Sequence, residues 1–315
     1  MTVSRVIHGR YGVSERMRQK VLKAMKRRDY VPDLIAAGLR SKSTNVIGLV
    51  IPDICDHFFP EITRSIQIEA SREDCSLILT HSNDSYALEC HEINMLRGFK
   101  VKGLIIAPSG NQKDTGVYKL LRKHSIPFVF IDRIKNGVPC SSVATDSRKG
   151  AFLLGRYLAA KKYRKWGYLK GPAGVYSSDQ HAKGLRDSLA EKGGESCSMV
   201  SVRAGFREKD GYAAVQKLRD KVNPDVIIGV NDLVAIGAYR FLREIGVRVP
   251  HDVALAGFSD LHSVDLLASP LTTVREPVEQ IGRIAMELLL AQIREPGKKT
   301  QSILLEPHLV VRDSA

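Results

Sequence analysis

The stretch VIIGVNDLVAIGAYRFLREIGVRVPHDVALAGFSD, residues 226–260, contains one complete strand–helix–strand unit. The short apolar runs Val226–Val230 and Val253–Ala256 have the composition of buried strands. Asp232–Ile245 between them has the apolar spacing of a helix. Strands that are apolar on both faces are typical of a parallel sheet with helices on both sides. The stretch therefore predicts an α/β fold.

The same alternation of strand and helix extends along the chain from residue 46. Further strand-like runs are Val46–Ile51, Leu77–Thr80, Leu104–Ala107, Phe128–Ile131, Val143–Thr145 and Trp166–Leu169. Further helical stretches are Glu61–Arg72, Ala87–Arg97, Lys149–Ala160, Lys209–Lys217 and Val278–Ile293. About ten such units are too many for one sheet, so we predict two doubly wound parallel-sheet subdomains with a cleft between them.

The composition narrows the class of protein. The chain has 315 residues, of which 43% are hydrophobic and 26% charged, which is typical of a soluble globular protein and excludes a disordered or fibrous chain. No apolar run is long enough to cross a membrane and none resembles a secretion signal, so we expect a cytoplasmic protein. The five cysteines include no CxxC pair, which predicts neither a disulfide framework nor a zinc site.

Positive charge is concentrated at the N-terminus. The whole chain carries a net charge of +14, and residues 1–45 hold eleven basic and three acidic side chains, a net charge of +8. A basic segment joined to a nearly balanced body indicates a polyanionic partner. The alternative is a charged helix that is simply exposed to water.

Residues 14–30 of this basic segment have the pattern of a helix. Ser14 can cap its N-terminus by accepting a backbone N–H, and the residue before Pro32 ends it. Met17, Val21, Leu22 and Met25 form an apolar stripe at helical spacing. We also expect short helices over Thr2–Gly9 and Asp33–Arg40, with a polar linker over residues 41–45.

The sequence proposes no catalytic site, metal site or cofactor. It contains no GxGxxG after a strand, no GxxxxGK[ST] loop, no HExxH and no GxSxG. Asp53, Asp56 and His57 could form a metal cluster, but the adjacent Phe58 and Phe59 favour a pocket wall. We therefore expect a protein that is not an enzyme.

Polar and aromatic residues follow several of the predicted strands. Because ligands of open α/β sheets bind beyond the carboxyl ends of the strands, these residues predict a pocket for a small polar molecule. The alternative is that loops at strand ends are polar because they reach water.

Two sets of segments resemble one family of proteins. The runs TVSRVIHG (2–9), VSERMRQKVLKAM (13–25) and YVPDLIAAGLRSKSTNVIGLVIPD (30–53) resemble the start of the lactose/galactose repressor family of bacterial transcription factors. FFPEI (58–62), FIDR (130–133), residues 229–260 and SPLTTV (269–274) resemble that family's sensor domain, in the same order. The resemblance covers essentially the whole chain.

The resemblance implies a dimeric transcriptional regulator, most often a repressor, with four parts. They are a partial helix-turn-helix headpiece over 1–31, a hinge helix and linker over 32–45, an N-terminal effector subdomain over 46–146 plus 275–304, and a C-terminal one over 147–274 plus 305–315. The effector subdomains would be related to periplasmic sugar-binding proteins. The implied partners are operator DNA, a small effector such as a sugar or sugar acid, and a second copy of the chain, with no membrane.

The resemblance also implies which residues contact DNA. The recognition helix would lie in the major groove, with Arg5 at a base edge, and Leu39 would wedge into the minor groove beside Ala36. For Leu39 the alternative is ordinary helix packing. The full set is Thr2, Ser4, Arg5, His8, Ser14, Tyr30, Ala36 and Leu39.

The effector-binding residues implied by the resemblance are Phe58, Ser82, Arg133, Asp146, His181, Phe206, Asn231 and Ser259. His181 stands where the family usually has a pocket arginine, so Arg133 would have to supply any fixed positive charge. Asn231 would bind hydroxyl groups through its amide.

The N-terminus departs from the family pattern. The family's headpiece opens with another helix and turn before the position of Thr2, so we expect the natural chain to start upstream and only a longer form to bind an operator. Asp33 also stands where the family usually has asparagine. The alternative is a sensor core that has lost specific DNA binding and acts as a small-molecule binding protein.

Overall fold

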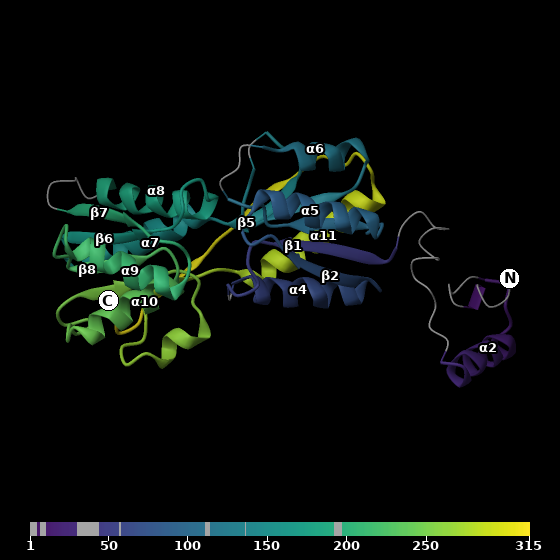
Figure 1. Cartoon of the computed structure of the whole chain (residues 1–315), viewed down its shortest axis with the longest axis horizontal. Coiled ribbons are helices and arrows are strands. Elements are labelled where there is room, and N and C mark those ends of the chain that lie inside the picture. Colours follow the sequence, from purple (N-terminus) through teal and green to yellow (C-terminus); the bar gives the residue numbers. More distant parts are fainter. Residues whose placement is uncertain are drawn as a thin grey trace.

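The computed structural model describes residues 5–6, 11–29, 44–56, 58–110, 114–135, 137–191 and 197–315. From residue 44 onward these residues form two α/β units, each with a parallel sheet between helices (Figure 1). We call them the first and the second unit. No helix in the described ranges is both long and apolar enough to cross a membrane.

The first unit contains a six-stranded parallel sheet in the order β11-β5-β4-β3-β1-β2. Its strands are β1 (Val46–Ile51), β2 (Ser76–His81), β3 (Gly103–Ile106), β4 (Phe128–Ile131), β5 (Ser141–Thr145) and β11 (Ser302–Leu305). The strand order reverses on either side of β1, because β2 and β3 flank it. Such a reversal places a crevice at the carboxyl ends of the strands.

Helices cover both faces of this sheet. One face packs against α4 (Phe58–Arg72) and α11 (Val278–Arg294), and the other against α5 (Tyr86–Gly98) and α6 (Gly116–Lys123). In β1, Ile47 and Leu49 belong to the first of these cores and Val50 to the second. Alternate side chains of a strand point to opposite faces, so each face needs its own apolar residues. This requirement explains the continuous apolar run.

The second unit contains a four-stranded parallel sheet in the order β7-β6-β8-β9. Its strands are β6 (Lys165–Lys170), β7 (Ser198–Arg203), β8 (Val226–Gly229) and β9 (Ala254–Ala256). Its helices are α7 (Ser147–Ala160), α8 (Tyr176–Glu191), α9 (Glu208–Arg219) and α10 (Asp232–Glu244), with α7 packed on α8 and α9 on α10. A 3₁₀ helix, η1 (His262–Leu266), and an antiparallel pair, β10 (Thr273–Arg275) with β12 (His308–Val310), complete the unit.

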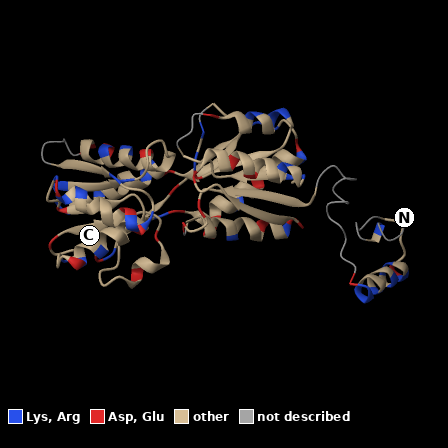
Figure 2. Cartoon of the chain, viewed as in Figure 1, with Lys and Arg blue, Asp and Glu red and all other residues tan. Residues whose placement is uncertain are grey.

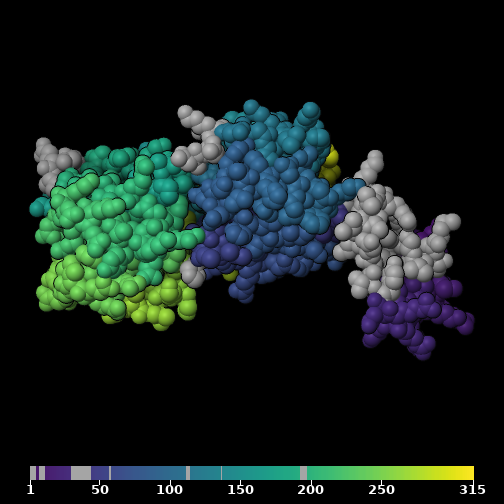
Figure 3. Space-filling model, in the orientation of Figure 1, coloured from purple at the N-terminus to yellow at the C-terminus, as the bar shows by residue number. Residues whose placement is uncertain are grey.

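The chain passes between the two units three times within the described residues. It leaves the first sheet after β5 to enter α7, returns from β10 to α11, and leaves again from β11 to β12. Figure 3 shows the two units side by side, green and blue. Residues at these connections therefore lie where the units meet.

The predicted α/β class with two parallel sheets is confirmed, and every predicted strand and helix from residue 46 onward is present. The prediction missed β7, β10, β11 and β12 and the helices α6 and α8. β7 lies at the edge of its sheet and is largely exposed, so its sequence SMVSVR lacks a continuous apolar run. α8 buries small residues and a histidine instead of an aliphatic stripe.

At the N-terminus, α2 (Glu15–Arg27) forms where the charged helix was predicted. Ser14 occupies the N-cap position, but its side chain makes no capping hydrogen bond, which corrects our expectation. The Ser14 backbone carbonyl instead accepts the N–H groups of Met17 and Arg18 at 2.9 Å. No residue of α2 is buried: Met17 and Leu22 are each 44% exposed, and Val21 and Met25 are only partly covered.

Candidate functional site

Two adjacent hollows lie at the carboxyl ends of the strands, where the units meet. The outer hollow has a volume of about 330 Å³ and is lined by loops after β1 and β2 and by the start of α9. The inner hollow, of about 50 Å³, is lined from the first unit by the start of α4 and the end of β4, and from the second by α8 and the ends of β8 and β9. Figure 2 shows acidic residues in red at this junction. Together the hollows have the size of a small-ligand site.

Six of the eight predicted effector residues line the inner hollow: Phe58, Arg133, His181, Phe206, Asn231 and Ser259. Ser82 and Asp146 do not line either hollow. Ser82 is fully buried, and its backbone N–H donates to the carbonyl of Ile51 at 2.8 Å. Asp146 caps α7 by accepting the backbone N–H of Lys149 at 2.9 Å. In the structure, both residues therefore form hydrogen bonds that hold the backbone near the hollows and do not line the hollows themselves.

The positive charge of Arg133 is already compensated within the protein. Its buried side chain donates from Nη1 to Asp84 at 2.6 Å and lies 3.6 Å from Asp132 through Nε. The guanidinium also lies over the ring of Phe206, 5.9 Å from its centroid. Nε itself has no hydrogen-bond partner among the described residues. Arg133 can therefore donate one further hydrogen bond but adds no net positive charge to the site.

His181 is buried and uncharged at neutral pH. Its ring stacks on Phe258 with centroids 3.9 Å apart and planes 13° from parallel. Burial lowers the pKa of His181 to about 3, against a smaller opposing effect from the backbone of Val230. The Nδ1 atom is buried and has no hydrogen-bond partner among the described residues. An unpartnered buried nitrogen is costly, so His181 gives the inner hollow a polar atom that a ligand could satisfy.

Asn231 uses much of its amide to hold the fold. Its side-chain oxygen accepts the backbone N–H of Val234 at 2.9 Å, which caps α10, and its side-chain nitrogen donates to the carbonyl of Phe206 at 2.9 Å. Each end of the amide keeps one further hydrogen-bonding position. Ser259 follows β9 with φ of 113°, a conformation that L-residues rarely adopt and that is often found at functional sites.

Three carboxyl groups line the inner hollow in addition to the predicted residues, those of Asp56, Asp132 and Glu276. Asp132, at the end of β4, is 9% exposed, and burial raises its pKa to about 6 despite the opposing effect of Arg133. Glu276 follows β10 at a connection between the units. Burial raises the pKa of Glu276 to about 8, and the charge of Asp132 adds to the effect, against smaller opposing effects from the side chains of Thr145 and Ser259. Glu276 was missed because its strand is short; the sequence signal for it is its position two residues after the SPLTTV segment.

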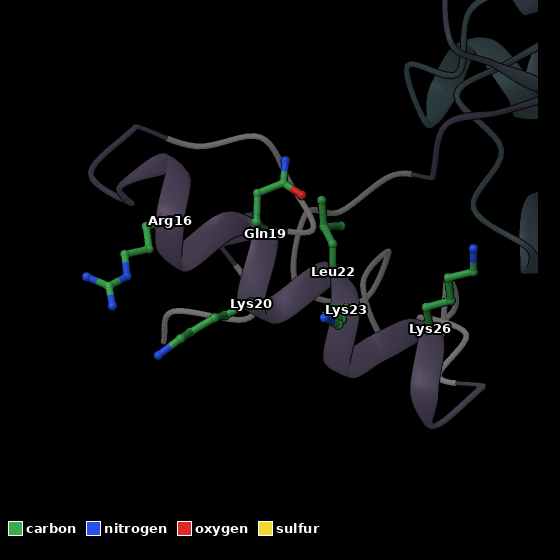
Figure 4. Close-up of a pocket in the computed structure, with 6 residues that line it drawn as sticks. All are labelled: Arg16, Gln19, Lys20, Leu22, Lys23 and Lys26. Atoms are coloured by element: carbon green, nitrogen blue, oxygen red, sulfur yellow. The ribbon is translucent and has the colours of Figure 1, made fainter.

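The described part of the N-terminal segment presents a basic surface. Figure 4 shows Arg16, Lys20, Lys23 and Lys26 with Gln19 and Leu22 around a surface hollow on α2. None of the Lys or Arg side chains of α2 forms an ion pair with another described residue. Uncompensated cations on one helix form a site that fits a polyanion.

Two of the predicted DNA-contacting residues are described. Arg5 is exposed and helical, and its guanidinium lies close to Gly12. Ser14 is exposed at the start of α2. Thr2, Ser4, His8, Tyr30, Ala36 and Leu39 lie outside the described residues, as do His57 and most of the predicted hinge.

Comparison with known families matches both ends of this architecture. The profile described as "Bacterial regulatory proteins, lacI family" matches residues 1–33. The profile described as "Periplasmic binding protein-like domain" matches residues 156–315, which is about half of the chain. The first match covers the basic segment and the second covers most of the second unit.

Whole proteins of the same organisation are similar to this chain. The HTH-type transcriptional repressor PurR of Mannheimia succiniciproducens is 30% identical over 99% of this chain and 94% of its own length. The HTH-type transcriptional regulator DegA of Bacillus subtilis is 29% identical over 99% of this chain and 93% of its own.

Solved structures of transcriptional regulators are also similar to this chain over nearly its whole length. The Lac repressor bound to ONPG is 25% identical, with a TM-score of 0.87 over 100% of this chain and 95% of that one. A complex of the transcriptional regulator CelR with cellobiose is 26% identical, with a TM-score of 0.79 over 99% of this chain and 94% of that one. The chain therefore belongs to the LacI family of bacterial regulatory proteins.

Proposed function

We propose that this chain is a transcriptional repressor that binds operator DNA as a dimer and is controlled by a small effector in the two hollows. The observation that carries the proposal is the joining, in one chain, of a lacI-type DNA-binding segment to a ligand-binding body of the periplasmic type. A transcriptional repressor, PurR, and a ribose operon repressor each match this chain over 99% of its length. These functions are not enzymatic, and no catalytic motif suggests another.

The proposed division of labour follows the segments. Residues 1–31 would bind DNA, with Thr2, Ser4, Arg5, His8, Ser14 and Tyr30 as contacts, and the hinge over 32–45 would place Ala36 and Leu39 at the minor groove. Residues 46–146 with 275–304, and 147–274 with 305–315, would form the two effector subdomains. The sheets support this division closely, since β11 pairs with β5 and β12 with β10.

Control by an effector would arise because ligand binding and the arrangement of the two units are thermodynamically linked. A ligand that binds one arrangement of the two units better than another shifts the population toward it, and typical coupling is about 1–3 kcal/mol. Phe58, Arg133, His181, Phe206, Asn231 and Ser259 would contact the ligand, since they line the inner hollow from both units.

The proposal is tested by capturing fragments of the host genome on purified protein and sequencing them, in parallel for this chain and for a form extended upstream of residue 1. We expect a small set of enriched sites with two-fold symmetry, and an affinity that falls steeply between 50 and 200 mM salt. Arg5→Ala should weaken binding to these sites by about 1–3 kcal/mol. The control is Arg72→Ala, which removes a guanidinium that is 67% exposed at the end of α4.

Equal binding by Arg5→Ala and the unaltered protein would contradict the assignment of Arg5. Absence of any enriched site, with ligand binding intact, would favour the small-molecule binding protein instead. The mass of the free protein in solution, measured by light scattering, tests the dimer.

A further inference from the structure

The hollows between the units are acidic although the protein as a whole is strongly basic. The chain carries a net charge of +14, yet seven carboxyl groups and two guanidinium groups line the two hollows among the described residues. His181 adds no charge at neutral pH. A cleft with one dominant sign of charge concentrates ligands of the opposite sign. The local charge thus differs in sign from that of the molecule.

Both guanidinium groups that line the hollows already form ion pairs with carboxylates of the protein. Arg133 pairs with Asp84 at 2.6 Å, and Arg207 pairs with Asp53 at 2.6 Å. These pairs neutralise two carboxylates, and the described residues that line the hollows include no further Lys or Arg for an anionic ligand. The site therefore disfavours a sugar acid, which we had included among the expected effectors.

Two of the remaining carboxyl groups meet at the inner hollow without adequate compensation. Glu276 forms no ion pair with any described Lys, Arg or His residue. The nearest cation to Asp132 is Arg133, at 3.6 Å and already bound to Asp84. Asp132 and Glu276 line the same small hollow, and the charge of Asp132 disfavours the ionised form of Glu276. A cation placed between them would relieve this repulsion.

Two further atoms at the same hollow need a partner. Nδ1 of His181, whose residue is 6% exposed, and Nε of Arg133, whose side chain is 7% exposed, are buried without a hydrogen-bond partner among the described residues. Their burial costs free energy unless a ligand or water pairs with them. The inner hollow is lined by both residues and by both carboxyl groups. These observations indicate a ligand with both a cationic group and hydroxyl groups.

We propose that the effector of this protein is a small amine, of the amino-sugar type, whose ammonium group binds between the carboxylates of Asp132 and Glu276. The hydroxyl groups of the ligand would pair with Nδ1 of His181 and Nε of Arg133. Glu276 is then the residue that selects a cationic ligand over a neutral one of the same shape. This inference rests on the proposed function, because it names the effector class of the same site.

The test compares sugars of similar shape that are cationic, neutral or anionic. D-glucosamine, D-galactosamine and D-mannosamine are each titrated beside the parent hexose and the corresponding uronic acid, by calorimetry at pH 7.5 and 0.15 M salt. We expect at least one amine to bind ten times or more tightly than its hexose, equivalent to about 1.4 kcal/mol, and no uronic acid to bind. Tighter binding of a hexose or a uronic acid overturns the proposal, and so does binding of no member of the set.

Variants then assign the preference to the carboxyl groups. Glu276→Gln keeps the shape of the side chain and should abolish the tenfold preference for the amine, as should Asp132→Asn. The matched control is Glu279→Gln, which removes the same charge from the exposed first turn of α11 and should keep the preference. An amine that binds Glu276→Gln as tightly as the unaltered protein overturns the proposal.

The DNA-capture experiment distinguishes a failure of the proposed regulator function from a failure of the proposed amine effector. Genomic fragments captured without any ligand test the regulator, whatever the effector is. Release of those fragments by a neutral or anionic compound would reject the amine and leave the regulator intact. Fragment release by the amine, lost in Glu276→Gln, supports both.

Discussion

Asp132 and Glu276 show how two ordinary acidic residues acquire unusual properties through their surroundings. Each lies at the end of a strand, and burial raises the pKa of both, to about 6 and about 8. Asp232, at the start of α10, has its pKa raised to about 7 by burial although it accepts hydrogen bonds from Leu261 N–H at 2.9 Å and the Thr273 hydroxyl at 2.7 Å. Each of these three carboxyl groups holds its proton more tightly in the folded protein than in the unfolded chain.

The raised pKa of Glu276 predicts how stability depends on pH. Because the folded protein holds this proton more tightly than the unfolded chain, stability is complete below about pH 4.5 and decreases as the pH rises through 8. Above pH 8, the free energy of unfolding of Glu276→Gln should therefore exceed that of the unaltered protein by about 2–5 kcal/mol. The upper end is the full shift from 4.5 to about 8, and the lower end allows for the partial exposure of the side chain. The gain should shrink toward pH 5. Urea unfolding across this range without ligand measures it, with Glu279→Gln as the control. A gain that does not change with pH would contradict the prediction.

At the scale of elements, the packing of α7 against α8 positions His181. The two helices approach closely at glycines: a Cβ added to Gly184 would lie 2.1 Å from the backbone oxygen of Arg148. A Cβ added to Gly155 would lie 1.9 Å from the hydroxyl of Ser188. Gly184 follows His181 by about one turn of α8. A change in the helix spacing would therefore move a side chain of the inner hollow.

Gly184→Ala should destabilise the protein by about 1–3 kcal/mol, because the backbone of α7 cannot yield as a side chain could. It should also weaken ligand binding through His181. Gly98→Ala is the matched control: it lies at the end of α5 with no atom within 4 Å of an added Cβ, and it should stabilise by about 0.5 kcal/mol. Urea unfolding midpoints of both variants test this. An unchanged urea midpoint for Gly184→Ala would show that α7 and α8 are not tightly packed against each other.

At the scale of the whole molecule, two side-chain contacts bridge the hollows. Arg207, just before α9 in the second unit, donates to Asp53 of the first unit at 2.6 Å, and Phe206 lies against Arg133. Three chain connections also join the units, and the one between β10 and α11 carries Glu276 of the inner hollow. The relative position of the units thus depends on weak contacts that a ligand can outweigh, as control by an effector requires.

Arg207→Ala should let the two units separate in the ligand-free protein and increase its radius of gyration in X-ray scattering. Ligand affinity should fall only slightly, by less than about fivefold, since an exposed ion pair contributes little. Arg240→Ala removes an arginine that pairs within the second unit, with Glu208 and Glu244, and should change neither quantity. Identical scattering from both variants would show that Arg207 does not hold the units together.

The fold class could be read from the sequence because its cause is local. A strand buried on both faces must be apolar at every position, as in β1, and this pattern needs no knowledge of distant residues. Strands that are only partly buried lack this continuous apolar run, so the edge strand β7 could not be predicted from the sequence. The family resemblance implied eight effector residues, and six of them line the inner hollow. The general position of a pocket could be read from the pattern, since the ends of parallel strands converge on one edge of a sheet.

The charge of the ligand site depended on the tertiary structure. Arg133 looked like a binding cation until the fold placed Asp84 beside it, and Glu276 looked ordinary until the return of the chain to the first unit brought it near Asp132. Such effects arise between residues far apart in the chain, and their strength depends on distance and burial. Local patterning contains neither quantity, so it indicates where a ligand binds, while three-dimensional packing sets what charge that ligand carries.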